Sequence, residues 1–191
     1  MIFELRTYDL RPGDAQRYMN LFANLGREII MRHLPMVGYY LTETGRLNRL
    51  IHLWRYEDLA ERAQRRSELY RDADWLRDFI PHGLPLLQSQ RNQLWIPAPG
   101  ADAANVNALH ADVVVPDEPF RPILMIESPL SVSGESRGEV LASLVSLTGA
   151  KRHLCLEAFP GQAALQRRLL ALQGGEAATD ILQPYAFSPL R

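Results

Sequence analysis

The sequence predicts an α+β protein of two tandem ferredoxin-like units, packed sheet to sheet as a pseudo-dimer. Three observations predict this fold class. Residues 1–97 read as strand, helix, strand, strand, helix, strand, the order of a ferredoxin-like unit whose two helices cover one face of an antiparallel sheet. A degenerate copy of this pattern follows residue 107. Each unit would leave one sheet face open, and a second sheet covers such a face.

The first half begins with an alternating strand at residues 2–9, IFELRTYD. A turn at 11–14 opens a helix, and apolar residues at helical spacing from Tyr18 to Ile29 extend it to about residue 33. Residues 36–42 and 47–56 then form a hairpin. Asp58 and Glu61 have the capping-box spacing, which predicts a second helix. A short helical segment at 72–79 and a strand at 88–96 complete the unit.

The strand at 47–56 carries the most informative side chains. His52, Trp54 and Tyr56 are two residues apart and therefore share one face, while Ile51 and Leu53 share the other. Both faces are predicted to be covered. The alternation does not say which of them points into a barrel.

The second half is a shorter copy, so we predict an internal duplication with domains at 1–98 and 108–191 and a linker at 99–107. Residues 122–129 predict its first strand, 139–147 its first helix, 152–159 the next strand and 181–184 the last. Paired arginines at 65–66 and 167–168 follow equivalent strands in the two halves. The strand equivalent to 36–42 is predicted to be lost, unless residues 108–115 replace it.

Composition excludes several classes of protein. Of 191 residues, 47% are hydrophobic and 23% charged, as in a folded soluble domain. The net charge of -1 argues against a general nucleic-acid-binding protein. We expect no membrane association and a cytoplasmic location, because no apolar run has the length of a membrane span and the N-terminus lacks a signal-peptide pattern. Cys155 is the only cysteine, which rules out an internal disulfide, and its apolar neighbours predict a core thiol.

A candidate ligand site involves residues on neighbouring strands: Arg6, Tyr8, His52, Trp54 and Tyr56. A guanidinium, an imidazole and two phenols on one face could bind a small anionic or aromatic ligand and donate a proton near neutral pH. Arg6, Tyr8 and His52 are the catalytic candidates. In the alternative interpretation Arg6 pairs with a carboxylate such as that of Glu4, and the aromatic rings only fill a barrel interface.

Two further groups of polar residues are candidate sites. Arg62 and Arg66 share a helix face and could clamp a carboxylate or phosphate, although such runs are more often solvated and paired within the helix. The five histidines, at 33, 52, 82, 110 and 153, have no paired spacing, so no metal site is predicted. No phosphate loop or nucleophile elbow is present in the sequence.

Several motifs resemble the NIPSNAP family. They are ELRTY at 4–8, HLWRY at 52–56, Arg62, Arg66, Asp72 and Trp75, with ILQP at 181–184 and FSPLR at 187–191 similar to the family's C-terminal ending. The resemblance covers nearly all of residues 1–97 and implies the dimeric α/β-barrel superfamily. It implies no settled enzymatic activity. Animal members are linked to mitochondria, vesicle transport and mitophagy signalling, but this chain has no visible transit peptide and has a bacterial style, so these roles are not carried over.

The functional hypothesis is a NIPSNAP family protein, with homodimerisation expected, that binds a small organic ligand in a barrel or sheet–helix pocket. The alternatives are a cofactor-independent monooxygenase or isomerase of the dimeric α/β-barrel type, and a protein-interaction module. No cofactor is predicted, while a haem held by one histidine, as in some relatives within the superfamily, stays open. The second half has Cys155, Glu157 and Phe159 where the first has its aromatic triplet, which predicts a single site.

Overall fold

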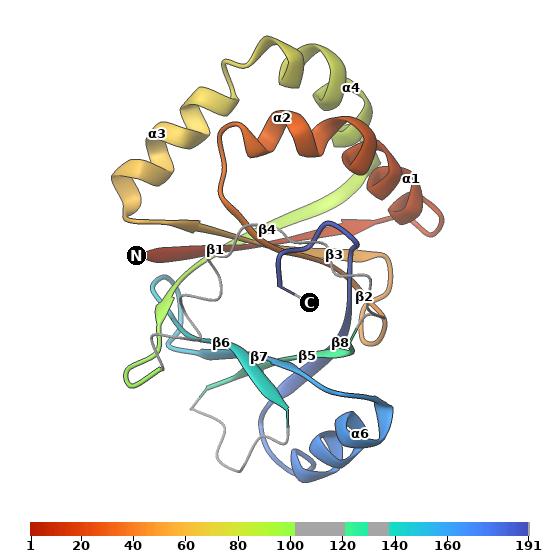
Figure 1. Ribbon diagram of the computed structural model, residues 1–191, viewed down its shortest axis with the longest axis vertical. Coiled ribbons are helices and arrows are strands. Elements are labelled where there is room, and N and C mark those ends of the chain that lie inside the picture. Colours follow the sequence, from red (N-terminus) through yellow and green to blue (C-terminus); the bar gives the residue numbers. More distant parts are fainter. Residues whose placement is uncertain (102–120, 130–137, 191) are drawn as a thin grey trace.

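The computed structural model describes residues 1–101, 121–129 and 138–190. Within these residues eight antiparallel strands close into one barrel, in the order β1-β3-β2-β8-β5-β7-β6-β4 (Figure 1). The strands are β1 (Ile2–Leu10), β2 (Met36–Thr42), β3 (Arg49–Tyr56), β4 (Leu87–Pro97), β5 (Ile123–Ser128), β6 (Glu139–Ser146), β7 (His153–Ala158) and β8 (Ala178–Pro184). The chain is therefore a mixed α/β protein rich in strands.

Helices cover the barrel from outside on two opposite sides (Figure 1). The helical segments are α1 (Asp14–Leu21), η1 (Phe22–Gly26), α2 (Arg27–Met31), α3 (Leu59–Leu69), η2 (Trp75–Phe79), α4 (Ile80–Gly83), η3 (Leu84–Leu86) and α6 (Gln162–Ala171). All but α6 lie over strands β1 to β4, and α6 lies over strands β5 to β8. In the described ranges no helix combines the length and hydropathy needed to cross a membrane.

The order of elements predicted for residues 1–97 is confirmed. Asp58 caps α3, since its Oδ1 accepts a hydrogen bond from the Glu61 amide at 2.8 Å. The Glu61 carboxylate accepts from the amide of Glu57 at 2.6 Å, one residue before the expected position. The capping box therefore forms in a slightly extended version that holds the strand end as well as the helix start.

Two π-helical segments, η1 and η2, pack against each other above the sheet. Their contact depends on Gly26, because a Cβ at that position would overlap the ring of Phe79. Each segment widens the helix locally and changes the direction in which its aromatic side chains point. In η1 Phe22 stacks on Tyr39 of the sheet at 4.5 Å between ring centroids, while in η2 Trp75 stacks on Phe79 at 4.4 Å.

The hydrophobic core has three parts, which follow from the layer order helix, sheet, sheet, helix (Figure 1). The barrel interior contains side chains from both halves, among them Phe3, Leu53, Trp95, Leu144 and Leu156. A second cluster lies between strands β1 to β4 and the helices above them. A third, smaller cluster lies between strands β5 to β8 and α6. Both faces of β3 are thus buried, as predicted for the strand at 47–56, whereas residues 88–92 of β4 are exposed.

Two predictions for the second half are wrong. Residues 139–147, predicted as a helix, contain strand β6, and β6 lies beside β7 as β2 lies beside β3, so the expected loss of a strand did not occur. The register shifts between Val140 and Ala142, and both Leu141 and Ala142 lie in the barrel core. The apolar residues of this segment have helical spacing in the sequence, and the bulge lets a strand bury them without strict alternation. Residues 108–115 and most of the 99–107 linker lie outside the described residues.

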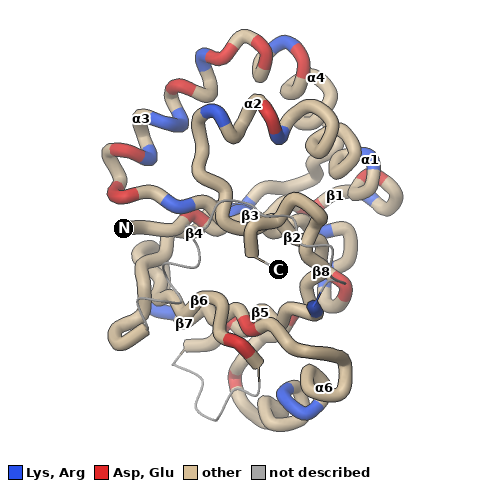
Figure 2. Tube along the Cα trace, viewed as in Figure 1, with Lys and Arg blue, Asp and Glu red and all other residues tan. Residues whose placement is uncertain are grey.

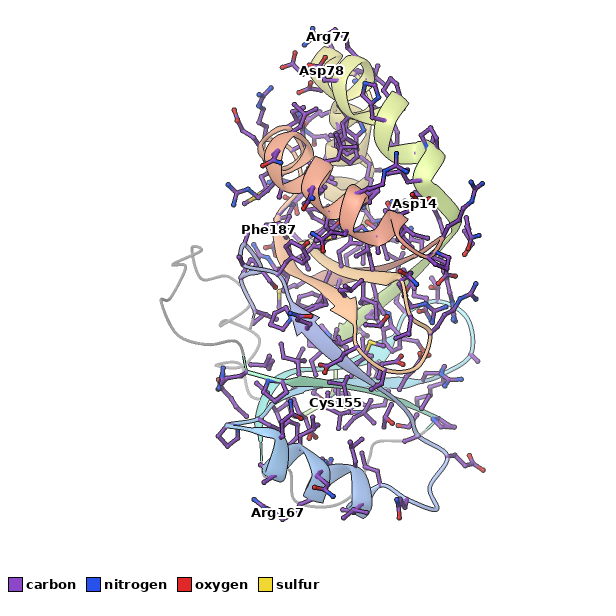
Figure 3. All side chains as sticks on the ribbon, turned by 90° about the vertical axis from the view of Figure 1, so that its right-hand side faces the viewer. Asp14, Arg77, Asp78, Cys155, Arg167 and Phe187 are labelled. Carbon is purple, nitrogen blue, oxygen red and sulfur yellow. The ribbon has the colours of Figure 1, made fainter. Side chains whose placement is uncertain are left out.

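The segment after β8 runs along β2 and enters the helical layer of the first half. The Tyr185 amide donates to the carbonyl of Tyr39 at 3.0 Å, and the Ser188 hydroxyl accepts from the Tyr39 amide at 3.0 Å. Phe187 then packs with its ring centroid 5.6 Å from Phe22 and 5.5 Å from Tyr39 (Figure 3). The second half thereby contributes an aromatic side chain to the layer above the first sheet.

Candidate functional site

The polar-aromatic face predicted from the sequence points toward the helices and away from the barrel interior. His52 lies opposite Arg6 of β1, while Ile51 and Leu53 on the other face of β3 belong to the barrel core. Tyr8 completes the face from β1, and Tyr39 of β2 lies opposite His52 on the other side. The predicted grouping of these side chains on neighbouring strands is correct, and the side of the sheet on which they lie is now known.

A cavity of about 150 Å³ lies between this face and the helices. Its lining residues include four predicted site residues, Tyr8, His52, Trp54 and Arg66. From the helical side the lining includes Tyr18, Phe22, Ile30, Leu69, Trp75, Phe79 and Ile80. Tyr70, Leu76 and Leu84 also line it and are about half exposed, at 54%, 46% and 47%, so they form its mouth.

His52 is fixed in one tautomer at the floor of this cavity. The indole N–H of Trp54 donates to His52 Nδ1 at 2.7 Å, and because an indole nitrogen is a donor only, Nδ1 must be the acceptor. The proton of the neutral imidazole therefore sits on Nε2. Nε2 is buried and has no hydrogen-bond partner among the residues that the structure describes. Burial, with the charges of Arg6 and Arg66, holds the pKa of His52 well below its usual value, so the ring is neutral.

Tyrosine side chains surround the imidazole. Tyr39 stacks on it, with 4.9 Å between the centroids and 23° between the planes, while Tyr8 approaches almost perpendicularly at 4.5 Å. Burial raises the pKa of Tyr8, Tyr18 and Tyr39, so all three phenols remain protonated at neutral pH. The Tyr39 hydroxyl is close enough to Tyr18 to affect its pKa, but within the described ranges it has no hydrogen bond of good geometry.

Beside the cavity, the buried carboxylate of Glu4 forms ion pairs with several arginine side chains. It accepts from Arg62 at 2.9 Å, from Arg66 at 2.8 Å and from the Tyr56 hydroxyl at 3.1 Å, and Arg6 lies 3.5 Å away. Burial alone would raise the pKa of Glu4, but the two hydrogen-bonded guanidinium groups outweigh it and lower the pKa. Arg62 and Arg66 do clamp a carboxylate, but an internal one, and the alternative pairing of Arg6 with Glu4 is also present.

Three predicted ligand-binding residues do not line the cavity. Arg6 donates to Gln90 at 3.0 Å and lies over the Tyr8 ring at 5.4 Å, while Tyr56 and Arg62 are directed to Glu4. Arg6, Tyr56 and Arg62 therefore support the side chains that face the cavity. Figure 2 shows the alternation of basic and acidic residues along α3, which carries Arg62 as well as the lining residue Arg66.

Sequence reasoning missed several lining residues that come from other elements. Tyr39 could have been found by the alternation of β2 opposite His52. Phe22 and Tyr18 belong to the apolar stripe of the first helix, and Trp75 and Phe79 lie in the short helical segment predicted at 72–79. Their shared role depends on the two π-helical segments, for which the sequence carries no clear signal.

No group of three histidine, cysteine or acidic side chains in the described part of the chain has a geometry that could hold a metal. His33 follows α2 and pairs with Asp72 at 2.8 Å. His153 lies 2.9 Å from the hydroxyl of Ser143. Each of these two histidines contacts a nearby polar side chain, and neither lines the cavity.

The equivalent face of the second half has different chemistry. Glu157 accepts two hydrogen bonds from Arg168 of α6, at 3.0 and 2.9 Å, in a fully buried pair. Burial, with the nearby Glu157 carboxylate, raises the pKa of Cys155 to about 12, so its thiol is inert at neutral pH (Figure 3). An ion pair and a thiol thus occupy the positions that hold the imidazole and aromatic rings in the first half.

The NIPSNAP family model matches residues 3–101, which is more than half of the chain. The chain belongs to the NIPSNAP family. It is 31% identical to protein NipSnap homolog 3B of Mus musculus over 93 residues, and 33% identical to protein NipSnap homolog 2 of Homo sapiens over 98 residues. These alignments cover 48% and 50% of this chain but only 37% and 33% of the two relatives. The NIPSNAP likeness lies in the half of the chain that contains the cavity.

Solved structures agree with this assignment. An uncharacterized NIPSNAP domain protein from Burkholderia xenovorans is 28% identical, with a TM-score of 0.51, over 53% of this chain and 98% of its own. A candidate monooxygenase from Lactobacillus acidophilus NCFM matches 96% of this NIPSNAP chain and 93% of its own, with a TM-score of 0.53. At 10% identity this second match shows the fold alone.

Proposed function

We propose that this NIPSNAP protein binds a small organic ligand in the cavity between the first sheet and its helices. The observation that carries the proposal is the buried, unpartnered Nε2–H of His52, a residue that lines that cavity. A buried donor without an acceptor destabilises the folded protein by about 1–3 kcal/mol, so most buried donors in proteins have a partner. A bound ligand that supplies an acceptor would satisfy this donor.

Two features of the cavity support binding over simple packing. Ligand sites are typically concave and mostly apolar, with a few fixed polar groups. Here most of the apolar side chains come from the helices, whereas the polar side chains of Tyr8, His52 and Gln90 come from the sheet. The half-exposed side chains of Tyr70, Leu76 and Leu84 give access from solvent.

The test is a fragment screen by ligand-observed NMR on the wild type and two matched variants. Leu84→Trp enlarges a half-exposed side chain at the mouth, while Leu170→Trp makes the same change on α6, at 55% exposure and outside the cavity lining. We expect fragments that bind the wild type to lose binding in Leu84→Trp and to keep it in Leu170→Trp. Failure of all fragments to bind, or equal binding to both variants, would contradict the proposal.

An enzymatic role in the same cavity is the second candidate. It is supported by a neutral imidazole and a protonated phenol whose rings are in contact, and by the fold shared with a candidate monooxygenase. The proposal of a cofactor-independent monooxygenase or isomerase would fail if His52→Ala and Tyr8→Phe kept full turnover of a substrate that the wild type converts.

We also propose that the two halves are a duplicated pair, with a domain at 1–98 and another at 108–191. The strand order supports this, because β4-β1-β3-β2 and β8-β5-β7-β6 are the same arrangement. Closure of the barrel leaves no open sheet edge among the described strands, so in this proposal the second half covers the first sheet as a dimer partner would. A cytoplasmic location and any further homodimerisation remain part of the proposal; native mass spectrometry would establish the oligomeric state.

A further inference from the structure

The size of the cavity limits what it can hold. At about 150 Å³ it matches an engineered apolar cavity in another protein that holds benzene. Aromatic side chains from the two π-helical segments, Phe22, Trp75 and Phe79, form much of its apolar wall. Flat rings of this kind favour offset or edge-to-face contacts with another ring. The occupant is therefore one ring in size.

The polar side of the cavity presents donors. Nε2 of His52 carries a proton because Nδ1 accepts from Trp54. The hydroxyl of Tyr39 is likewise buried and unpartnered as far as the described residues go. Both groups can give a hydrogen bond to an occupant, and the imidazole can only give one at its free nitrogen. The occupant must supply an acceptor.

The local charge favours an anionic acceptor. Three guanidinium groups, those of Arg6, Arg62 and Arg66, share the single carboxylate of Glu4. The excess of positive charge reaches the cavity through Arg66, which lines it. Burial lowers the pKa of His52, and the charges of Arg6 and Arg66 lower it further, as expected for two guanidinium groups near the imidazole. An anion at this point would gain from the same field that opposes a second proton on the ring.

We infer that the cavity takes a single-ring aromatic anion, a benzoate-type carboxylate or a phenolate, with its charged oxygen accepting from His52 Nε2–H near Arg66. Its ring lies against Trp75 and Phe79. This inference rests on the proposed ligand-binding function and adds the chemical class of the ligand.

The test compares four probes of similar size by isothermal titration calorimetry on the whole protein: benzoate, benzamide, toluene and benzylamine. We expect benzoate to bind most tightly, by roughly tenfold or more over toluene, since a hydrogen bond with a charged partner is among the stronger ones. Benzylamine is expected to bind most weakly.

Two substitutions locate the effect. His52→Phe removes the donor and is expected to abolish the preference for benzoate over toluene, whereas His52→Gln keeps a donor and an acceptor and is expected to restore part of it. If His52→Phe fails to fold, the probe series on the wild type and on His52→Gln still decides the matter.

The outcomes separate the two proposals. Equal binding of benzoate and toluene, or tighter binding of benzylamine, would overturn the anionic class and leave the ligand-binding function standing. A preference for benzoate that persists in His52→Phe would overturn the role of Nε2. Absence of binding by all four probes, together with a failed fragment screen, would overturn both.

Discussion

Replacement of Glu4 by glutamine tests how the arginine cluster is held. The substitution keeps the shape of the side chain but removes the charge, and Arg62 and Arg66 remain with no carboxylate at hydrogen-bond distance among the residues that the structure describes. Removal of one partner of a buried ion pair costs about 3–5 kcal/mol. Because the two arginine side chains keep 24% and 14% of their exposure, water offsets part of the loss, and we expect about 3 kcal/mol. For a chain of this size that lowers Tm by roughly 6–12 °C.

The measurement is urea denaturation followed by circular dichroism, at several pH values. Glu28→Gln is the matched control, because the Glu28 side chain is 84% exposed and its pair with Arg32 is 3.5 Å long, so we expect a change within about 0.5 kcal/mol. The folded-state pKa of Glu4 lies below its ordinary value of 4.5, so its stabilisation is present above that pH and is lost as the pH falls through the lower folded value. A Glu4→Gln variant as stable as Glu28→Gln at neutral pH would refute this account.

Three further predictions concern other buried positions. As the pH falls below about 6.5, His52 becomes protonated in the unfolded chain but stays neutral in the native protein, so the wild type loses stability. We expect the His52→Phe variant to lose less stability over the same pH range. Thermal melts at pH 7.5 and 5.5 would measure the difference, and equal losses in the two proteins would contradict the prediction. Gly26→Ala should cost roughly 1–3 kcal/mol through overlap with the Phe79 ring, whereas Gly161→Ala, with open space around it, should be near neutral in the same denaturation assay. Cys155 should react with a thiol reagent only as the protein unfolds, because its pKa is about 12 and it is buried; rapid labelling of the native protein would oppose this.

Much of the first half could be predicted because its local signals agree with one another. The cap at Asp58, the stripe from Tyr18 to Ile29 and the alternation of β1 and β3 each correspond to an observed element. The direction of the His52 face could not be predicted, since a sheet buried on both sides has apolar residues on both faces. Tertiary packing alone decided that His52 faces helices.

The failures in the second half have a specific cause. Residues 139–147 have apolar side chains at helical spacing, and the bulge beside Leu141 lets a strand bury that same pattern. The cavity was also out of reach of the sequence, because its apolar wall depends on two π-helical segments and on the close approach of Gly26 to Phe79. A void between two well-packed layers is a property of the assembled fold.

The packing of Phe187 beside Phe22 and Tyr39 constrains the order of events during synthesis. A ribosome makes the whole first sheet, which ends with β4 at Pro97, and its helices about 5–18 s before residue 187 is joined, at about 5–20 residues per second. During that interval the layer above β2 lacks one of its rings, and the amide of Tyr39 lacks its bond to Ser188, 149 positions later in the chain. The first half can collapse early, yet its interior becomes complete only when the second half has been made and its final segment has returned.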